Sequence, residues 1–107
     1  MNTFTGSGRL LKNANLNGNE NKALNFTIAA KYGYNKDEEK DRVEFIPCVL
    51  FKPSERLAEF LTEDGKGTLV EFQGRINTSR YEVKGETKYS TQVVINKCSF
   101  NILSTTN

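Results

Sequence analysis

The sequence predicts a mainly β protein in which five strands form a barrel and one helix lies between the third and fourth strands. Apolar and polar residues alternate at period two in several separate segments, which is typical of half-buried strands. A single segment shows helical spacing, and the segments are separated by glycine- and asparagine-rich turns. At 107 residues with 36% hydrophobic and 26% charged residues, the chain fits one small domain. We expect this domain to span residues 1–103, with a short polar tail at residues 104–107.

The first two expected strands flank a turn-rich loop. The first runs from about Thr3 to Leu11, and its glycines, Gly6 and Gly8, suit a sharply curved or closely approached strand. Residues 12–21 hold five asparagines and a glycine, which predicts a loop. The second strand spans about Lys22 to Tyr32, and one of its faces is apolar: Leu24, Phe26, Ile28 and Ala30.

The third expected strand, about Arg42 to Phe51, follows a polar connector at residues 33–41 and has two apolar faces. Because side chains alternate along a strand, one face carries Ile46, Cys48 and Leu50, and the other carries Phe45, Pro47, Val49 and Phe51. One apolar face is enough to build a core. The second face therefore predicts an oligomer interface, a ligand platform, or both. Aromatic side chains on an accessible sheet face among basic residues are typical of surfaces that stack unpaired nucleobases.

The remaining elements complete the barrel. Residues 53–62 place Leu57, Ala58, Phe60 and Leu61 on one helical face. The fourth strand spans about Thr68 to Thr78, with Val70, Phe72 and Ile76 facing inward. Residues 80–87 predict a hairpin arm that turns near Lys84-Gly85, and the fifth strand runs from about Lys88 to Phe100. Three strands, a helix and two strands are the order of the OB-fold. An SH3-like barrel is the main structural alternative.

The composition excludes several function classes. The chain has no His, and neither Cys48 nor Cys98 has a visible base partner, so we expect no enzyme, no metal site, no cofactor and no small-molecule substrate. Both cysteines are expected to be small buried thiols. No stretch approaches the roughly 20 apolar residues of a membrane span, and the N-terminus does not match a signal peptide. We therefore expect a cytoplasmic protein.

The net charge of +2 excludes a histone-like polycation but does not exclude nucleic-acid binding, which depends on where the basic residues lie. An acidic run at residues 37–41 is expected to form a solvated loop. From Ile76 onward the charged residues are mostly basic: Arg80, Glu82, Lys84, Glu86, Lys88 and Lys97.

Several segments together resemble bacterial single-stranded DNA-binding proteins. The resemblance covers about residues 3–101 in the family's order and spacing, and no single segment decides it. The segments are Gly8-Arg9-Leu10, Asn25-Phe26-Thr27-Ile28-Ala29, Phe45-Ile46-Pro47-Cys48-Val49-Leu50-Phe51, Gly74-Arg75-Ile76-Asn77-Thr78-Ser79-Arg80-Tyr81 and Tyr89-Ser90-Thr91-Gln92-Val93-Val94.

This resemblance implies four base-stacking positions: Tyr34, Phe45, Phe51 and Tyr81. The family often has Trp at several of these positions, whereas this chain has no Trp and therefore offers smaller platforms. Tyr32 and Tyr89 are expected to be packing residues. The basic residues near the platforms are candidate phosphate contacts: Arg9, Lys31, Arg75, Arg80, Lys84 and Lys88.

The resemblance also implies a homo-oligomer, either tetramer or dimer, with the first strand as the candidate pairing edge. Cellular members continue into a Gly/Pro-rich linker and an acidic tip, whereas this sequence stops at Asn107. It is thus either a truncated form or a minimal version of phage or plasmid type. The implied function is sequence-independent coating and protection of single-stranded DNA in replication, recombination and repair. The alternatives are a primosomal-type OB-fold adaptor that binds other proteins, and an RNA-binding OB-fold protein.

Overall fold

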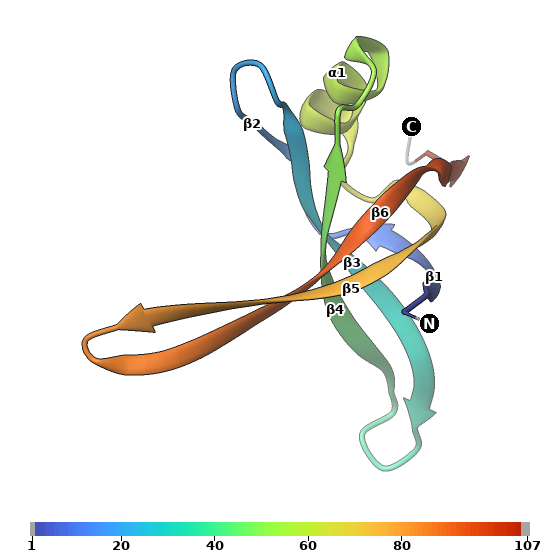
Figure 1. Cartoon of the computed structure of the whole chain (residues 1–107). Coiled ribbons are helices and arrows are strands. Elements are labelled where there is room, and N and C mark those ends of the chain that lie inside the picture. The colour runs from blue at the N-terminus through green and yellow to red at the C-terminus, as the bar shows by residue number, and fades with distance from the viewer. Residues whose placement is uncertain (1, 106–107) are drawn as a thin grey trace.

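The computed structural model describes residues 2–105, and for residues 32–35 it describes the backbone alone. The helix and strands of this part of the chain follow one another as β1 (Phe4–Leu10), β2 (Asn15–Asn17), β3 (Ala23–Asn35), β4 (Lys40–Phe51), α1 (Glu55–Asp64), β5 (Leu69–Val83) and β6 (Glu86–Ser104). Five long strands form a closed barrel with one helix between β4 and β5 (Figure 1). The predicted OB-fold is therefore confirmed.

The barrel closes through a ring of strand pairs. The order β1-β5-β6-β4-β3 is completed by pairing of β1 with β3, and the β4–β6 pair is parallel while the others are antiparallel. Closure requires β1 to lie very close to β3, and Gly8 makes this possible. A Cβ atom at this position would lie 2.5 Å from the carbonyl oxygen of Ala29. The glycine predicted to mark a close approach therefore lies at the seam of the barrel.

Strand pairing extends further than the sequence pattern indicates. The connector expected at residues 33–41 is instead the end of the β3–β4 hairpin, with Gly33 opposite Arg42 and Asn35 opposite Lys40. In the loop expected at residues 12–21, β2 pairs with the start of β3. Both segments are polar, and backbone hydrogen bonds can form a ladder without an apolar face to mark it.

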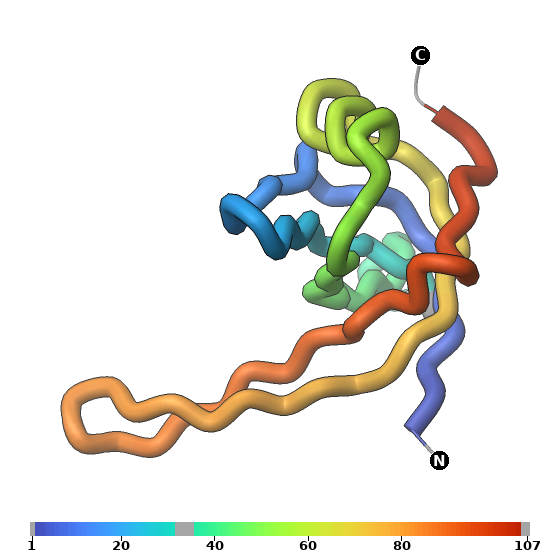
Figure 2. Tube along the Cα trace, turned by 45° about the horizontal axis from the view of Figure 1, so that its top comes forward, coloured from blue at the N-terminus to red at the C-terminus, as the bar shows by residue number. Residues whose placement is uncertain are grey.

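The β5–β6 hairpin is a long ribbon that projects from the barrel (Figures 1 and 2). Its predicted turn is confirmed, since Lys84 and Gly85 both have positive φ angles, of 52° and 80°. Such a two-residue turn matches the twist of the flanking strands. Ile76 lies opposite the buried Val93, on the predicted face, but is 42% exposed, and most of the residues that follow it on β5 are exposed too.

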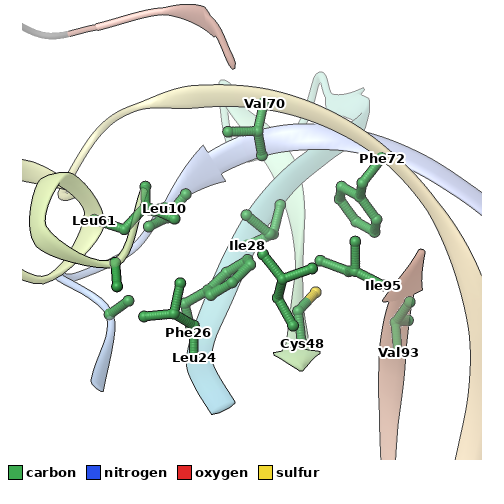
Figure 3. Close-up of a cluster of buried hydrophobic side chains, with 13 residues drawn as sticks. Leu10, Leu24, Phe26, Ile28, Cys48, Leu61, Val70, Phe72, Val93 and Ile95 are labelled. Carbon is green, nitrogen blue, oxygen red and sulfur yellow. The ribbon is translucent and has the colours of Figure 1, made fainter. Parts of the chain in front are cut away.

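The core fills the barrel and is covered at one end by α1. Figure 3 shows side chains from all five barrel strands converging, and Leu61 of α1 lying beside Leu10. Ser54 caps the helix by accepting a hydrogen bond from the Leu57 amide. Asn13 fixes the far end of the helix, because its Nδ2 donates to the Glu63 carbonyl and its Oδ1 accepts from the Lys66 amide. The one helix of residues 2–105 has neither the length nor the hydropathy needed to cross a membrane.

Candidate nucleic-acid interface

The outer face of β4 carries two exposed phenylalanines. Phe45 is 59% exposed and Phe51 is 50% exposed, while Ile46 between them packs against the core. Phe51 follows Phe45 by six positions, which places the two residues about 20 Å apart along β4. This confirms the prediction of a second, accessible face. The face is not uniformly open, however, because Val49 is buried at 3% exposure between its neighbours on β3 and β6.

Two basic residues lie next to Phe45. Arg9 of β1 pairs with Ala29 of β3, and Ala29 pairs with Phe45, so the three side chains share the outer face. Lys31 and Arg9 both line a hollow of about 350 Å³ on this face. Arg9 donates from Nη1 to the Gly67 carbonyl at 2.9 Å, which fixes its guanidinium close to the end of β1.

The ammonium group of Lys31 lies 3.1 Å from a carboxylate oxygen of Asp41. Both side chains are exposed, and an exposed ion pair contributes little to stability. The ion pair can therefore exchange for a contact between Lys31 and a phosphate. Phe45, Arg9 and Lys31 thus come together from three strands, as an aromatic platform with two cations beside it.

The same face continues across β6 and β5 into the hairpin ribbon. Val49 pairs with Val94, and Val94 pairs with Arg75, so Arg75 lies on the outer face. Tyr81 pairs with Lys88 further out on the hairpin. Tyr81 follows Arg75 on β5 by an even number of positions, and Lys88 precedes Val94 on β6 by the same number. Tyr81 therefore shares a face with Arg75. Tyr81 is 45% exposed. The register of the hairpin thus adds Arg75, Tyr81 and Lys88 to the surface that holds Phe45.

Two other candidate contacts lie elsewhere on the ribbon. Arg80 pairs with Tyr89, one position away from the Tyr81–Lys88 pair, and so lies on the opposite face of the hairpin. Lys84 lies in the turn at the tip. Tyr89 is 66% exposed, so the expectation that it is a packing residue is wrong. Its immediate neighbours, Lys88 and Ser90, are polar and could have indicated a solvent-exposed segment.

The side chain of Tyr34 lies outside the described residues. Its backbone pairs with Asp41 near the end of the β3–β4 hairpin. Tyr34 therefore remains a candidate from the family resemblance alone.

The two cysteines have different surroundings. Burial raises the pKa of the Cys48 thiol to about 12, and its Sγ donates to the Ile46 carbonyl at 3.5 Å. Cys48 is therefore a neutral core residue and not a nucleophile. Cys98 is exposed, which corrects the prediction that both thiols are buried. Cys98 lies within the irregularity of the β5–β6 register, between Ile95, which pairs with Gly74, and Phe100, which pairs with Phe72. This position could not be inferred from a cysteine's usual preference for the core.

Comparison with known proteins identifies the family of the chain. Residues 1–101 match the family model described as the single-strand binding protein family. Three similar proteins come from species of Oceanobacillus and Clostridium. The chain is 33% identical over 97 residues to the "Single-stranded DNA-binding protein" of Oceanobacillus iheyensis, covering 87% of this chain and 58% of that protein.

Two clostridial proteins match over more of their length. The chain is 34% identical over 105 residues to the "Single-stranded DNA-binding protein" of Clostridium tetani, covering 94% of this chain and 70% of that protein. It is 32% identical over 105 residues to "Single-stranded DNA-binding protein 1" of Clostridium acetobutylicum, covering 94% of this chain and 93% of that protein. The family match over residues 1–101, on a closed five-stranded barrel, shows that the chain belongs to the single-strand binding protein family.

Proposed function

We propose that the protein binds single-stranded DNA without sequence preference and protects it during replication, recombination and repair. The observation that carries the proposal is the outer face of β4, where Phe45 is exposed near Arg9 and Lys31 and Phe51 is exposed further along the same strand. The names of the bacterial relatives support the same ligand.

The proposed binding combines two physical terms. Stacking of a base on an aromatic ring contributes about 1–3 kcal/mol and does not depend on which base is stacked. Cations beside the rings neutralise phosphates and release counterions, so affinity should fall as salt is raised. Duplex DNA is a poor ligand in this account, because its bases are already stacked on one another.

The same proposal covers the role of the whole chain. Residues 1–103 form the binding domain and residues 104–107 a short polar tail. The protein acts in the cytoplasm as a non-enzymatic binder. Stacking and phosphate contacts need no acid, base or nucleophile, and the candidate contact residues on the proposed surface are aromatic or basic. The family match favours this function over a primosomal-type adaptor.

We further propose a homo-oligomer, either dimer or tetramer, that pairs through β1. The strand pairs with β5 along Phe4–Arg9, but its other edge pairs with β3 only at Arg9 and Leu10. Within the described chain, the edge of residues 4–8 is therefore unpaired on one side, and an open edge readily accepts another strand. Sedimentation equilibrium measures the state directly, and a monomer at micromolar concentration would contradict this part of the proposal.

The proposed ligand is tested by fluorescence anisotropy of a labelled oligo(dT) of about 35 nucleotides at two salt concentrations. Duplex DNA and RNA of equal length serve as competitors. We expect tight, salt-sensitive binding that duplex does not displace. Absence of binding at low salt by the folded protein would contradict the proposal, and displacement by RNA at equal concentration would favour the RNA-binding alternative.

A further inference from the structure

A groove of about 300 Å³ lies on the outer surface at the middle of β4. Its lining comes from the segment after β1 and from β2, β3, β4 and β6, and most of its polar groups are side-chain amides. The lining residues that matter here are Asn13, Asn15, Asn25, Thr27, Pro47 and Gln92. We call this hollow the amide groove.

The amide groove lies between the two exposed phenylalanines. Pro47 is two residues from Phe45 and four from Phe51 on the same face of β4, or about 7 Å and 13 Å along the strand. Thr27 pairs with Pro47 and Asn25 pairs with Val49, so both side chains share this face. A DNA strand that lies along β4 and stacks on both rings must therefore pass over the amide groove.

Three of the four amides are available to a ligand. Both polar atoms of the Asn13 amide are occupied, by the Glu63 carbonyl and the Lys66 amide. Among the residues that the structure describes, the side-chain amides of Asn15, Asn25 and Gln92 have no hydrogen-bond partner. Asn25 and Gln92 are also half-buried. A partly desolvated amide without a partner gains more from a new hydrogen bond than one that is fully exposed to water.

The chemistry of the amide groove fits a base better than a phosphate. Of its lining side chains only Lys12 is charged, and the rest are amides, a hydroxyl or apolar groups. An amide offers donors and acceptors side by side. The pairing edge of a splayed-out base in a single strand also carries adjacent donors and acceptors.

We infer that the amide groove receives an unpaired base and hydrogen-bonds its Watson–Crick edge through Asn25 and Gln92, while neighbouring bases stack on Phe45 and Phe51. The inference rests on the proposed function and adds a second mode of base contact to it. Because an amide can rotate to exchange its donor and acceptor positions, the contact tolerates any base. The contact requires a base whose Watson–Crick edge is not already paired with another base. This is a second reason why duplex DNA should not bind.

A modified ligand separates edge contacts from stacking. An oligomer of N3-methylthymidine keeps its rings and phosphates, but the methyl group replaces the donor on the pairing edge. We expect the wild-type protein to bind it about two- to tenfold more weakly than oligo(dT) of equal length, as expected for the loss of one net hydrogen bond. Asn25→Leu and, separately, Gln92→Leu should reduce this difference between the two oligomers.

The matched control is Asn101→Leu, which removes an exposed amide of β6 outside the amide groove. It should keep the full discrimination. Equal binding of both oligomers by the wild type would overturn the inference, as would unchanged discrimination in folded Asn25→Leu and Gln92→Leu proteins. Failure of the wild type to bind even oligo(dT) would instead overturn the proposed function, and the amide-groove inference with it.

Discussion

Tyr81 and Tyr89 lie on opposite faces of the β5–β6 hairpin, each beside a basic residue of the facing strand. Tyr81 pairs with Lys88, and Tyr89 pairs with Arg80. Only the Tyr81 face is continuous, through the strand register, with Arg75 and the outer face of β4. The hairpin therefore presents an aromatic residue and a cation on each side, and one side belongs to the proposed binding surface.

Replacing each tyrosine in turn separates the two faces. Tyr81→Ala should weaken oligo(dT) binding by about 1–3 kcal/mol, the contribution of one stacked base. Tyr89→Ala removes the same atoms from the other face and should change the affinity much less. The two variants therefore control for one another in an anisotropy titration. Equal losses would mean that the strand contacts both faces of the hairpin.

Lys88 should contribute one phosphate contact. Lys88→Gln is expected to weaken binding and to lower the slope of log affinity against log salt by about 0.7, the value for one phosphate on a single strand. Lys97→Gln makes the same charge change at an exposed position outside the proposed surface and should leave the slope unchanged. A Lys88→Gln protein with the wild-type slope would remove this residue from the contact path.

Cys48 should make the fold less stable in alkaline solution. Its pKa is raised by burial from 9.0 to about 12, so above pH 9 the unfolded chain loses a proton that the folded chain keeps. The free energy of unfolding should then fall by about 1.4 kcal/mol per pH unit between these values.

Urea unfolding from pH 8 to pH 11 measures this decrease, and Cys48→Ala should show a shallower one because it lacks the titrating group. Cys98→Ser is the control, since it changes the exposed cysteine and should keep the wild-type dependence. The same slope in Cys48→Ala and wild type would show that another group causes the alkaline loss.

Thr68 offers a route to a more stable protein. Its side chain is fully buried. Among the buried side-chain nitrogen and oxygen atoms of residues 2–105, the hydroxyl oxygen of Thr68 is the one that lacks a hydrogen-bond partner. Thr68→Val keeps the shape and removes the unpaired group, so it should raise the free energy of unfolding by about 1 kcal/mol. Thr62→Val is the contrast, because its hydroxyl donates to the Ala58 carbonyl at 2.8 Å and its loss should not stabilise. A Thr68→Val protein less stable than the wild type would contradict this reading.

The sequence predicts the fold well where a side-chain pattern reflects a packing constraint. Alternation along residues 42–51 assigns Phe45 and Ile46 to opposite faces, because a strand has a period of two and only one face can enter the core. Gly8 marks the seam of the barrel because no larger residue fits against Ala29. The turn at Lys84-Gly85 follows from the backbone conformation that a two-residue hairpin requires.

The rest depends on relations between strands that one sequence does not reveal. Val49 is buried because of its neighbours across β3 and β6, not because of the residues beside it in sequence. The partnering of Tyr81 with Lys88 follows from the hairpin register, and so does the separation of Arg80 from this pair. The amide groove likewise combines side chains from several elements, and no local pattern joins Asn25 to Gln92.

The most direct test of the account is the affinity of a folded Phe45→Ala/Phe51→Ala double variant for oligo(dT). Both rings are at least half exposed, so their removal should leave the barrel intact, which circular dichroism and thermal unfolding can verify. The control is an Ile102→Ala/Leu103→Ala variant, which removes two exposed apolar side chains at the end of β6. We expect the first variant to lose about 2–6 kcal/mol of binding free energy, the contribution of two stacked bases, and the control to lose little. Wild-type affinity in the folded Phe45→Ala/Phe51→Ala protein would contradict the central claim that the outer face of β4 is the base-stacking surface.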